Sequence, residues 1–207
     1  MKTYLSKCAL FVIIFLSYSA NILGKEPLKY RTSLSLYRDL SDTYGKGSIL
    51  SGEFSIKKFW YGASLDFGYF QAQSTFIYKI NIEEINKTFE IQFDEISIMQ
   101  SSAISLVVIP IQKEWLELDI AFGAALSTAT SSQFNNVDYS YDLAQDKFTY
   151  LYKDYKLVKR THFGYQVGFN LSFYVLPKIG LQLSSRIQDL SNGGTFFFVG
   201  GGICFKI

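Results

Sequence analysis

The sequence predicts an all-β fold, an eight-stranded antiparallel up-and-down β-barrel. Large apolar residues alternate with small or polar residues in one segment after another, which is the period of a β-strand. No long stretch has the 3.6-residue period of an amphipathic helix. Short connections are interspersed with long ones, which is typical of a membrane barrel with tight turns at one end and loops at the other.

Eight segments carry the alternation. The clearest is 163–173, in which Phe, Tyr, Val and Leu occupy one parity and Gly, Gln, Asn and Ser occupy the other. In chain order, the predicted strands are 30–38, 47–57, 61–69, 101–109, 116–126, 163–173, 179–186 and 197–207.

Three short links and four longer connections join these strands. The short links are 57–58, 110–113 and 176–178, and the longer connections are 39–46, 73–100, 127–159 and 189–195. Within 73–100 the alternation continues past the length a bilayer needs, so we expect a hairpin that extends beyond the membrane. Segment 127–159 is predicted as a loop rich in tyrosine. Its rings either form a recognition surface or pack within an extended sheet.

Composition excludes several classes of function. A length of 207 residues suits one domain, and 48% hydrophobic residues exclude a disordered chain. Two cysteines cannot supply a disulfide framework or a zinc site, and one histidine excludes a histidine-based metal centre. A formal charge of +2 is too small for a nucleic-acid binder. We therefore predict no cofactor, no metal and no nucleic-acid partner.

Residues 1–24 are predicted to be a cleaved signal peptide, which leaves 25–207 as the barrel domain. Two lysines precede an apolar run, 8–16, and small residues precede the expected cleavage site. The run of about nine residues is far shorter than the roughly 20 of a membrane-spanning helix. A short buried helix is the alternative interpretation.

Side-chain size indicates which face of the barrel points outward. The interior of an eight-stranded barrel is barely wide enough for its own side chains, so the large apolar parity of 163–173 would overfill it. We therefore expect Phe169 to face lipid and Asn170 to face the lumen. The alternative is a soluble periplasmic, lipocalin-like ligand-binding calyx, which needs a more charged outer face than this parity offers.

Charged residues on the lumen-facing parity form a candidate ion-pair network. Buried charges are costly unless they are paired. We expect a network that closes the lumen, with Arg186 as its hub because a guanidinium can hold two carboxylates. A selective pore is the other interpretation. The candidate residues are Arg31, Glu53, Asp66, Glu117, Asp119, Arg186 and Lys206.

Three segments resemble the small outer-membrane β-barrel ("porin family") proteins of Gram-negative bacteria. They are 107–115 (VVIPIQKEW), 164–186 (GYQVGFNLSFYVLPKIGLQLSSR) and 200–207 (GGGICFKI). The resemblance implies a transmembrane barrel in the outer membrane, with short periplasmic turns and longer extracellular loops. It also implies a structural, adhesive or narrow-pore role, with outer-membrane lipid and the barrel-assembly machinery as partners. Such barrels commonly end in an aromatic residue, whereas this chain ends in Ile207 with Phe205 on the same face.

Some barrels of this kind are lipid A-modifying enzymes, which is a further alternative. The deacylase type places a histidine, a serine and an acid on the lipid-facing wall. His162 is the only histidine, and Gly164 stands where that family would show a serine. His162 also shares the lumen-facing parity. We therefore predict no catalytic residues and no enzymatic activity.

Overall fold

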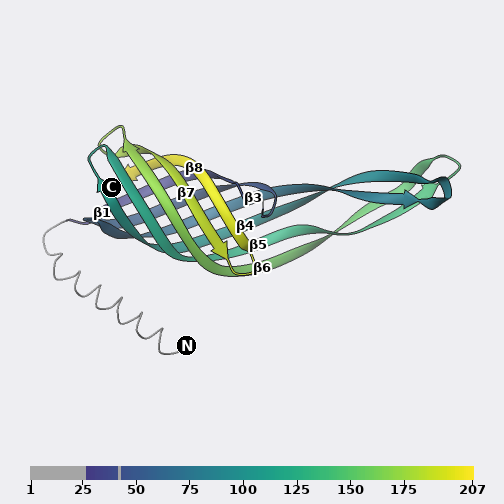
Figure 1. The fold of residues 1–207 in the computed structure, drawn as a ribbon, viewed down its shortest axis with the longest axis horizontal. Helices are drawn as coiled ribbons and strands as arrows, with labels where there is room; N and C mark the ends of the chain where they lie inside the picture. Colours follow the sequence, from purple (N-terminus) through teal and green to yellow (C-terminus); the bar gives the residue numbers. More distant parts are fainter. Residues whose placement is uncertain (1–26, 42) are drawn as a thin grey trace, which may run out of the picture.

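The computed structural model describes residues 27–41 and 43–207, and the predicted signal peptide, 1–24, lies outside the described residues. Eight strands and one short 3-10 helix make up the described chain (Figure 1). Among the described residues, no helix is long and apolar enough to cross a membrane. The elements are β1 (Lys29–Asp39), β2 (Lys46–Lys58), β3 (Tyr61–Ile82), η1 (Glu83–Ile85), β4 (Lys87–Gln112), β5 (Leu116–Asp142), β6 (Lys147–Tyr174), β7 (Ile179–Leu190) and β8 (Gly194–Lys206).

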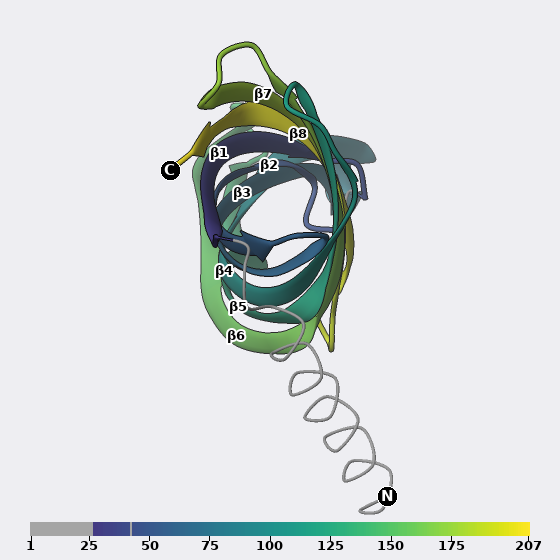
Figure 2. The ribbon, with the colours of Figure 1, turned by 90° about the vertical axis from the view of Figure 1, so that its left-hand side faces the viewer.

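The eight strands close into the predicted antiparallel up-and-down barrel. Each strand pairs with the next one along the chain, and β8 returns to pair with β1 through the register Leu34↔Ile203. Figure 2 looks along this ring of strands. The short turns after β2, β4 and β6 lie at the same end of the barrel as the start of β1 and the C-terminus, so that end is called the terminal end below.

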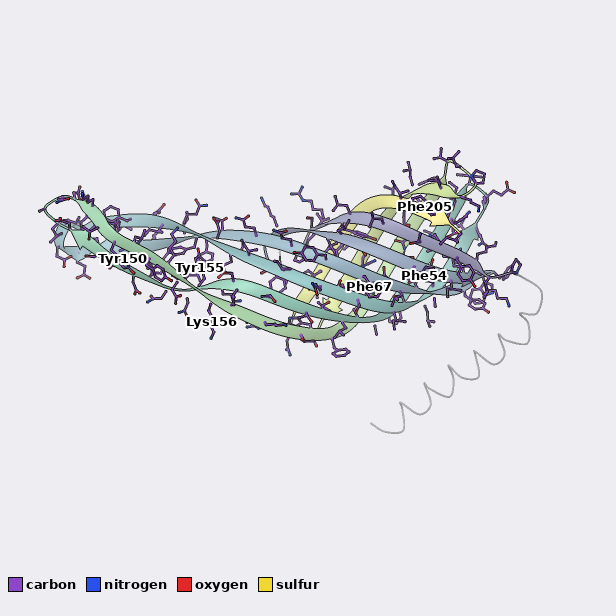
Figure 3. The ribbon with its side chains drawn as sticks, turned by 180° about the vertical axis from the view of Figure 1, so that it is seen from behind. Phe54, Phe67, Tyr150, Tyr155, Lys156 and Phe205 are labelled. Carbon is purple, nitrogen blue, oxygen red and sulfur yellow. The ribbon has the colours of Figure 1, made fainter. Side chains whose placement is uncertain are left out.

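The predicted orientation of the two faces is confirmed. Phe169 is 45% exposed on the outer wall, whereas Asn170 is 5% exposed inside the barrel. Large apolar side chains cover the outside of every strand, among them Phe54, Phe67 and Phe205 in Figure 3. The narrow interior takes the small and polar parity instead.

The outer apolar belt stops at a defined place on each strand, which we call the upper rim. Along β1 the outward side chains Leu34 and Leu36 are followed by Arg38. Along β6 the outward Phe163 is followed, towards the extension, by Thr161. The belt therefore has the band-like form of a lipid-facing surface between polar ends.

Four strands continue past the upper rim as two separate hairpins, called the extension below. Pairing between β4 and β5 stops at Ile96↔Ser132, whereas β3–β4 pairing runs on to Ile82↔Lys87 and β5–β6 pairing to Asp142↔Lys147. Figure 1 shows the two ribbons projecting far beyond the barrel. The nine residues 74–82 alone span roughly 30 Å at about 3.3 Å per residue.

The first hairpin confirms the extension predicted within 73–100. The connection 127–159 forms the second hairpin, which agrees with the interpretation that its rings pack within an extended sheet: Tyr141 and Tyr155 pack against the buried cluster there. Two β-bulges, at Phe134/Asn136 and at Ser140/Tyr141, each shift the register by one residue. A bulge reverses which parity faces inward, so no single alternation runs along the segment. The alternation of apolar and polar residues in the sequence is therefore interrupted, although β5 and β6 continue through the bulges.

Depth in the apolar belt should determine the cost of an outward-facing charge. We expect Phe169→Arg to lower the free energy of unfolding by about 2–4 kcal/mol, because a guanidinium would enter hydrocarbon. Thr161→Arg lies past the belt and should cost about 0–1 kcal/mol. Urea unfolding in lipid vesicles measures both values. Equal penalties would contradict the position assigned to the upper rim.

Candidate functional site: the barrel lumen and its extension

A layer of buried ion pairs crosses the lumen near the terminal end. Arg31, on β1, is almost fully buried and contacts three carboxylates from two other strands. Its Nη2 lies 2.8 Å from Oε1 of Glu53 on β2, and its Nη1 lies 3.2 Å from Oε1 of Glu117 and 2.5 Å from Oδ2 of Asp119 on β5. This guanidinium therefore joins β1, β2 and β5 across the interior.

Lys57 is the residue of this layer that the sequence interpretation missed. It was placed in a tight link, but the turn begins after Lys58 and Lys57 is buried in the lumen. Its Nζ forms ion pairs with Glu117 and with Oδ2 of Asp119, the latter at 2.6 Å. The available signal was parity, since Lys57 continues the inward series of Glu53 on the same strand.

A second ion pair lies farther along the lumen. Nη2 of Arg186 lies 2.7 Å from Oδ1 of Asp66, and Nε2 of Gln166 donates to Oδ2 of the same carboxylate at 3.1 Å. The guanidinium also lies 5.2 Å from the ring centroid of Tyr37. The prediction of Arg186 as the hub is wrong, because it reaches one carboxylate whereas Arg31 reaches three.

Lys206 completes the set at the open mouth of the terminal end. Its Nζ lies 3.3 Å from the ring centroid of Tyr174, and both residues line a small cavity of about 90 Å³ together with Glu117. Adding Lys57 to the predicted residues gives four bases and four acids, so the charges balance. The bases are Arg31, Lys57, Arg186 and Lys206, and the acids are Glu53, Asp66, Glu117 and Asp119.

An apolar layer fills the lumen on the upper-rim side of these charges. Phe196 and Phe198 stack with ring centroids 5.6 Å apart, and Phe70 meets both rings edge-on at 5.8 and 5.9 Å. Buried Ile49 and Met99 pack in the same cluster. The sequence analysis did not predict this layer, because Phe70 and Phe196 lie just outside the predicted strands 61–69 and 197–207. Two layers therefore occlude the lumen, one polar and one apolar.

His162 lies in the lumen, as its parity indicated. It is buried beside the turn between β7 and β8, and its Nδ1 lies 3.1 Å from the carbonyl oxygen of Ser191. A lipid-modifying enzyme of the deacylase type would need this imidazole on the lipid-facing wall.

Aromatic rings join the two hairpins of the extension. Phe93 of the first hairpin and Phe134 of the second have ring centroids 4.2 Å apart, and Phe89 and Phe148 are 4.9 Å apart. Aliphatic side chains bury themselves between these pairs. The buried members of this cluster are Ile80, Ile82, Ile91, Phe93 and Val137. Such a core, rather than shared backbone pairing, holds the hairpins together.

Polar contacts link the tips of the hairpins. Lys87 of the first hairpin forms an ion pair with Asp146 of the second, and the hydroxyl of Tyr141 donates to the same carboxylate. Both partners hold the pKa of Asp146 below its usual range. Partial burial and the hydrogen bond to Asp146 raise the pKa of Tyr141 to about 12.

One strand of the extension is basic, tyrosine-bearing and unpaired on one side. Residues 147–160 of β6 contain five basic residues and one acid, Asp154. Pairing with β7 begins only at Gly164, so these residues pair with β5 alone. Tyr150 and Tyr152 are 52% and 53% exposed. Figure 3 shows Tyr150 and Lys156 along this strand. The segment offers cations and aromatic faces to solvent.

Loss of Arg31 should destabilise the barrel more than loss of Arg186. Arg31→Met leaves three buried carboxylates with one lysine between two of them, and removing one partner of a buried pair costs about 3–5 kcal/mol. Arg186→Met removes the ion-pair partner of one carboxylate only, that of Asp66. Urea unfolding of the two variants in the same vesicles gives the comparison. A larger loss of unfolding free energy in Arg186→Met than in Arg31→Met would show that Arg186 is the hub after all.

The carboxylate of Asp146 should control the ionisation of Tyr141. We expect Asp146→Asn to lower the Tyr141 pKa from about 12, because the negative charge that opposes formation of the phenolate is removed. NMR titration of ¹³C-labelled tyrosine, assigned with Tyr141→Phe, measures the change. Asp142→Asn is the control in the same turn. An unchanged pKa in Asp146→Asn would mean that the tips are not linked through this contact.

No protein-family model and no curated protein matches the sequence. Solved structures do match. The N-terminal β-barrel domain of Pseudomonas aeruginosa OprF has a TM-score of 0.51 at 10% identity, covering 88% of this chain and 100% of that chain. Neisserial surface protein A has a TM-score of 0.50 at 12% identity, covering 87% and 97%. Ail of Yersinia pestis, in complex with the heparin analogue sucrose octasulfate, has a TM-score of 0.50 at 10% identity, covering 88% and 99%.

These comparisons confirm the fold that the resemblance implied. The neighbours share with this chain an antiparallel barrel over nearly their whole lengths, and they support the predicted location in the outer membrane of a Gram-negative bacterium. The chain has the fold of the small outer-membrane β-barrel proteins.

Proposed function

We propose that this chain is an integral outer-membrane protein, exported by residues 1–24, with an adhesive role. Its barrel is an anchor whose lumen does not conduct, and its extension is the binding element on the cell exterior. Outer-membrane lipid surrounds the barrel, and the barrel-assembly machinery inserts it. No catalytic step is part of this proposal.

The filled lumen argues against both a pore and a soluble calyx. A diffusion pore needs an open aqueous path, but two side-chain layers occupy the interior. A ligand-binding calyx needs a cavity at the same place. It also needs a polar exterior, whereas Phe67, Phe122 and Phe163 are each more than half exposed on the wall. The lipid-facing belt fits a membrane anchor instead.

The single observation that carries the adhesive role is the locked pair of hairpins. The aromatic contacts and the Lys87–Asp146 ion pair fix the hairpins relative to one another far beyond the upper rim. A surface ordered before binding loses little conformational entropy when it meets a partner. Exposed Tyr150 and Tyr152 supply large contact areas with few rotatable bonds. An anchor alone would need no such structure.

The charge of β6 suggests the chemistry to test first. Its five basic residues between 147 and 160 favour a polyanion, and Ail is the neighbour crystallised with a heparin analogue. Contacts of this kind weaken as salt rises, because dissolved ions screen the attraction between the charges.

Immobilised heparin provides the binding test. The unmodified protein should bind and elute with salt, and Lys156→Gln/Lys159→Gln/Arg160→Gln should elute at clearly lower salt. The control removes three exposed lysines from the terminal end, Lys29→Gln/Lys113→Gln/Lys178→Gln, and should elute with the unmodified protein. If the control variant loses as much heparin binding as the β6 variant, retention reflects total charge, and the assignment of binding to β6 is wrong.

Membrane insertion and closure are tested separately. The protein should fractionate with the outer membrane and change electrophoretic mobility on boiling. In planar bilayers it should give no steady conductance, because wide channels appear only at about 16 strands. Recovery as a soluble periplasmic protein would overturn the anchor. Steady porin-like conductance would make a pore the better proposal.

A further inference from the structure

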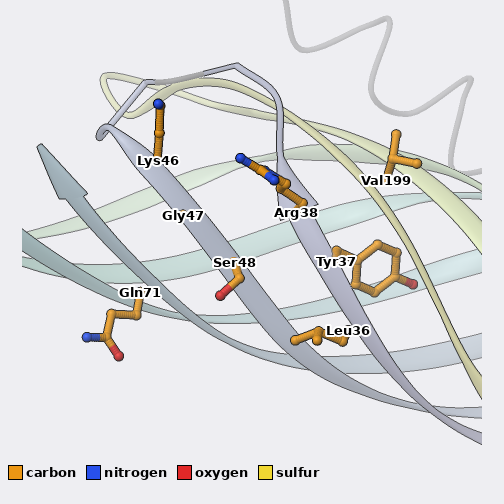
Figure 4. A pocket seen from close by; sticks show the side chains of 8 residues that line it. All are labelled: Leu36, Tyr37, Arg38, Lys46, Gly47, Ser48, Gln71 and Val199. Carbon is orange, nitrogen blue, oxygen red and sulfur yellow. The ribbon is translucent and has the colours of Figure 1, made fainter.

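A hollow of about 490 Å³ lies on the outer wall at the upper rim, where β8, β1, β2 and β3 run side by side (Figure 4). It is distinct from the lumen and from the extension. Arg38 and Lys46 lie at its polar part, and Leu36 and Val199 contribute apolar side chains. It therefore combines two chemistries in one concave surface.

The strand register explains why the two chemistries meet there. Arg38 of β1 pairs with Val199 on one side and with Ser48 on the other, and Ser48 pairs in turn with Gln71. These residues form one row of outward side chains across four strands. Two residues nearer the terminal end, the next outward row contains Leu36, Leu50 and Tyr69. The hollow thus lies across the edge of the apolar belt.

The polar half of the hollow is positively charged. Arg38 and Lys46 are its only charged lining residues, and both are exposed. In the part of the chain that the structure describes, neither forms an ion pair. Ser48 and Gln71 add a hydroxyl and an amide that can donate hydrogen bonds. Cations at the depth of lipid headgroups attract anions.

We propose that this hollow binds the phosphorylated headgroup of an outer-leaflet lipid, which rests on the proposed membrane location. The guanidinium of Arg38 and the ammonium of Lys46 contact the phosphate oxygens, and Ser48 and Gln71 donate to the remaining acceptors. The acyl chains lie against Leu36 and Val199 and continue along the belt. A soluble anion would contact only the polar half, so the apolar half selects a ligand with a tail in the bilayer.

Lipid titration of the delipidated barrel in mild detergent tests this site. Native mass spectrometry counts the lipids bound, with bisphosphorylated lipid A as the probe, dephosphorylated lipid A as the matched lipid and inorganic phosphate as the free anion. We expect one saturable site for the bisphosphorylated lipid, much weaker retention of the dephosphorylated lipid and no saturation by phosphate. Arg38→Gln/Lys46→Gln should weaken binding about 30-fold, from two cations near the headgroup plane.

Lys113→Gln/Lys178→Gln is the control, because it removes the same charge from exposed turns at the terminal end. It should retain the lipid with unchanged affinity. Equal affinity for the two lipids, or an unaffected Arg38→Gln/Lys46→Gln variant, would overturn the inference. Saturation by phosphate alone would overturn the lipid as the ligand. Heat-shifted mobility shows that each variant is folded, so a folded outer-membrane barrel without this selectivity contradicts the inference and leaves the proposed function intact.

Discussion

The narrow interior of an eight-stranded ring is the constraint on which the rest of this structure depends. It admits few side chains, so along most of each barrel strand small or polar residues face inside and large apolar residues face outside. The exception is the apolar layer of Phe70, Phe196 and Phe198 near the upper rim. The same division makes the outer wall a lipid-facing belt. Because the side chains leave little space for water, the buried charges depend on partners within the protein.

The charged layer meets that requirement because several cations and carboxylates share contacts, and not through a single strong ion pair. Arg31 and Lys57 share Glu117 and Asp119, so each carboxylate faces two cations and each cation faces at least two carboxylates. Shared contacts of this kind fix relative strand positions, because a shift in register would break several of them together. The apolar layer on the upper-rim side needs no directed contacts of this kind, and it closes the lumen because its side chains fill the space.

Parity was sufficient to predict the barrel, its strand number and its two faces, because a rule of period two needs only local information. It also identified His162 and most of the lumen charges. It failed where position depends on contacts across the ring. Which carboxylates Arg31 reaches follows from the stagger of eight strands, and the parity of 127–159 was interrupted by two bulges. Lys57 was missed because two adjacent lysines resemble a turn.

The extension is subject to the opposite constraint from the barrel. Without a closed ring, its four strands expose backbone edges, and exposed edges invite uncontrolled pairing with other chains. Lysines along 147–160 oppose such pairing by charge, and the aromatic core removes the inner faces of both hairpins from solvent. The same lysines and the tyrosines between them remain the accessible chemistry of the hairpins. In the proposed adhesive role, this basic strand would both oppose pairing with other copies and meet an anionic partner, so the same residues would serve protection and binding.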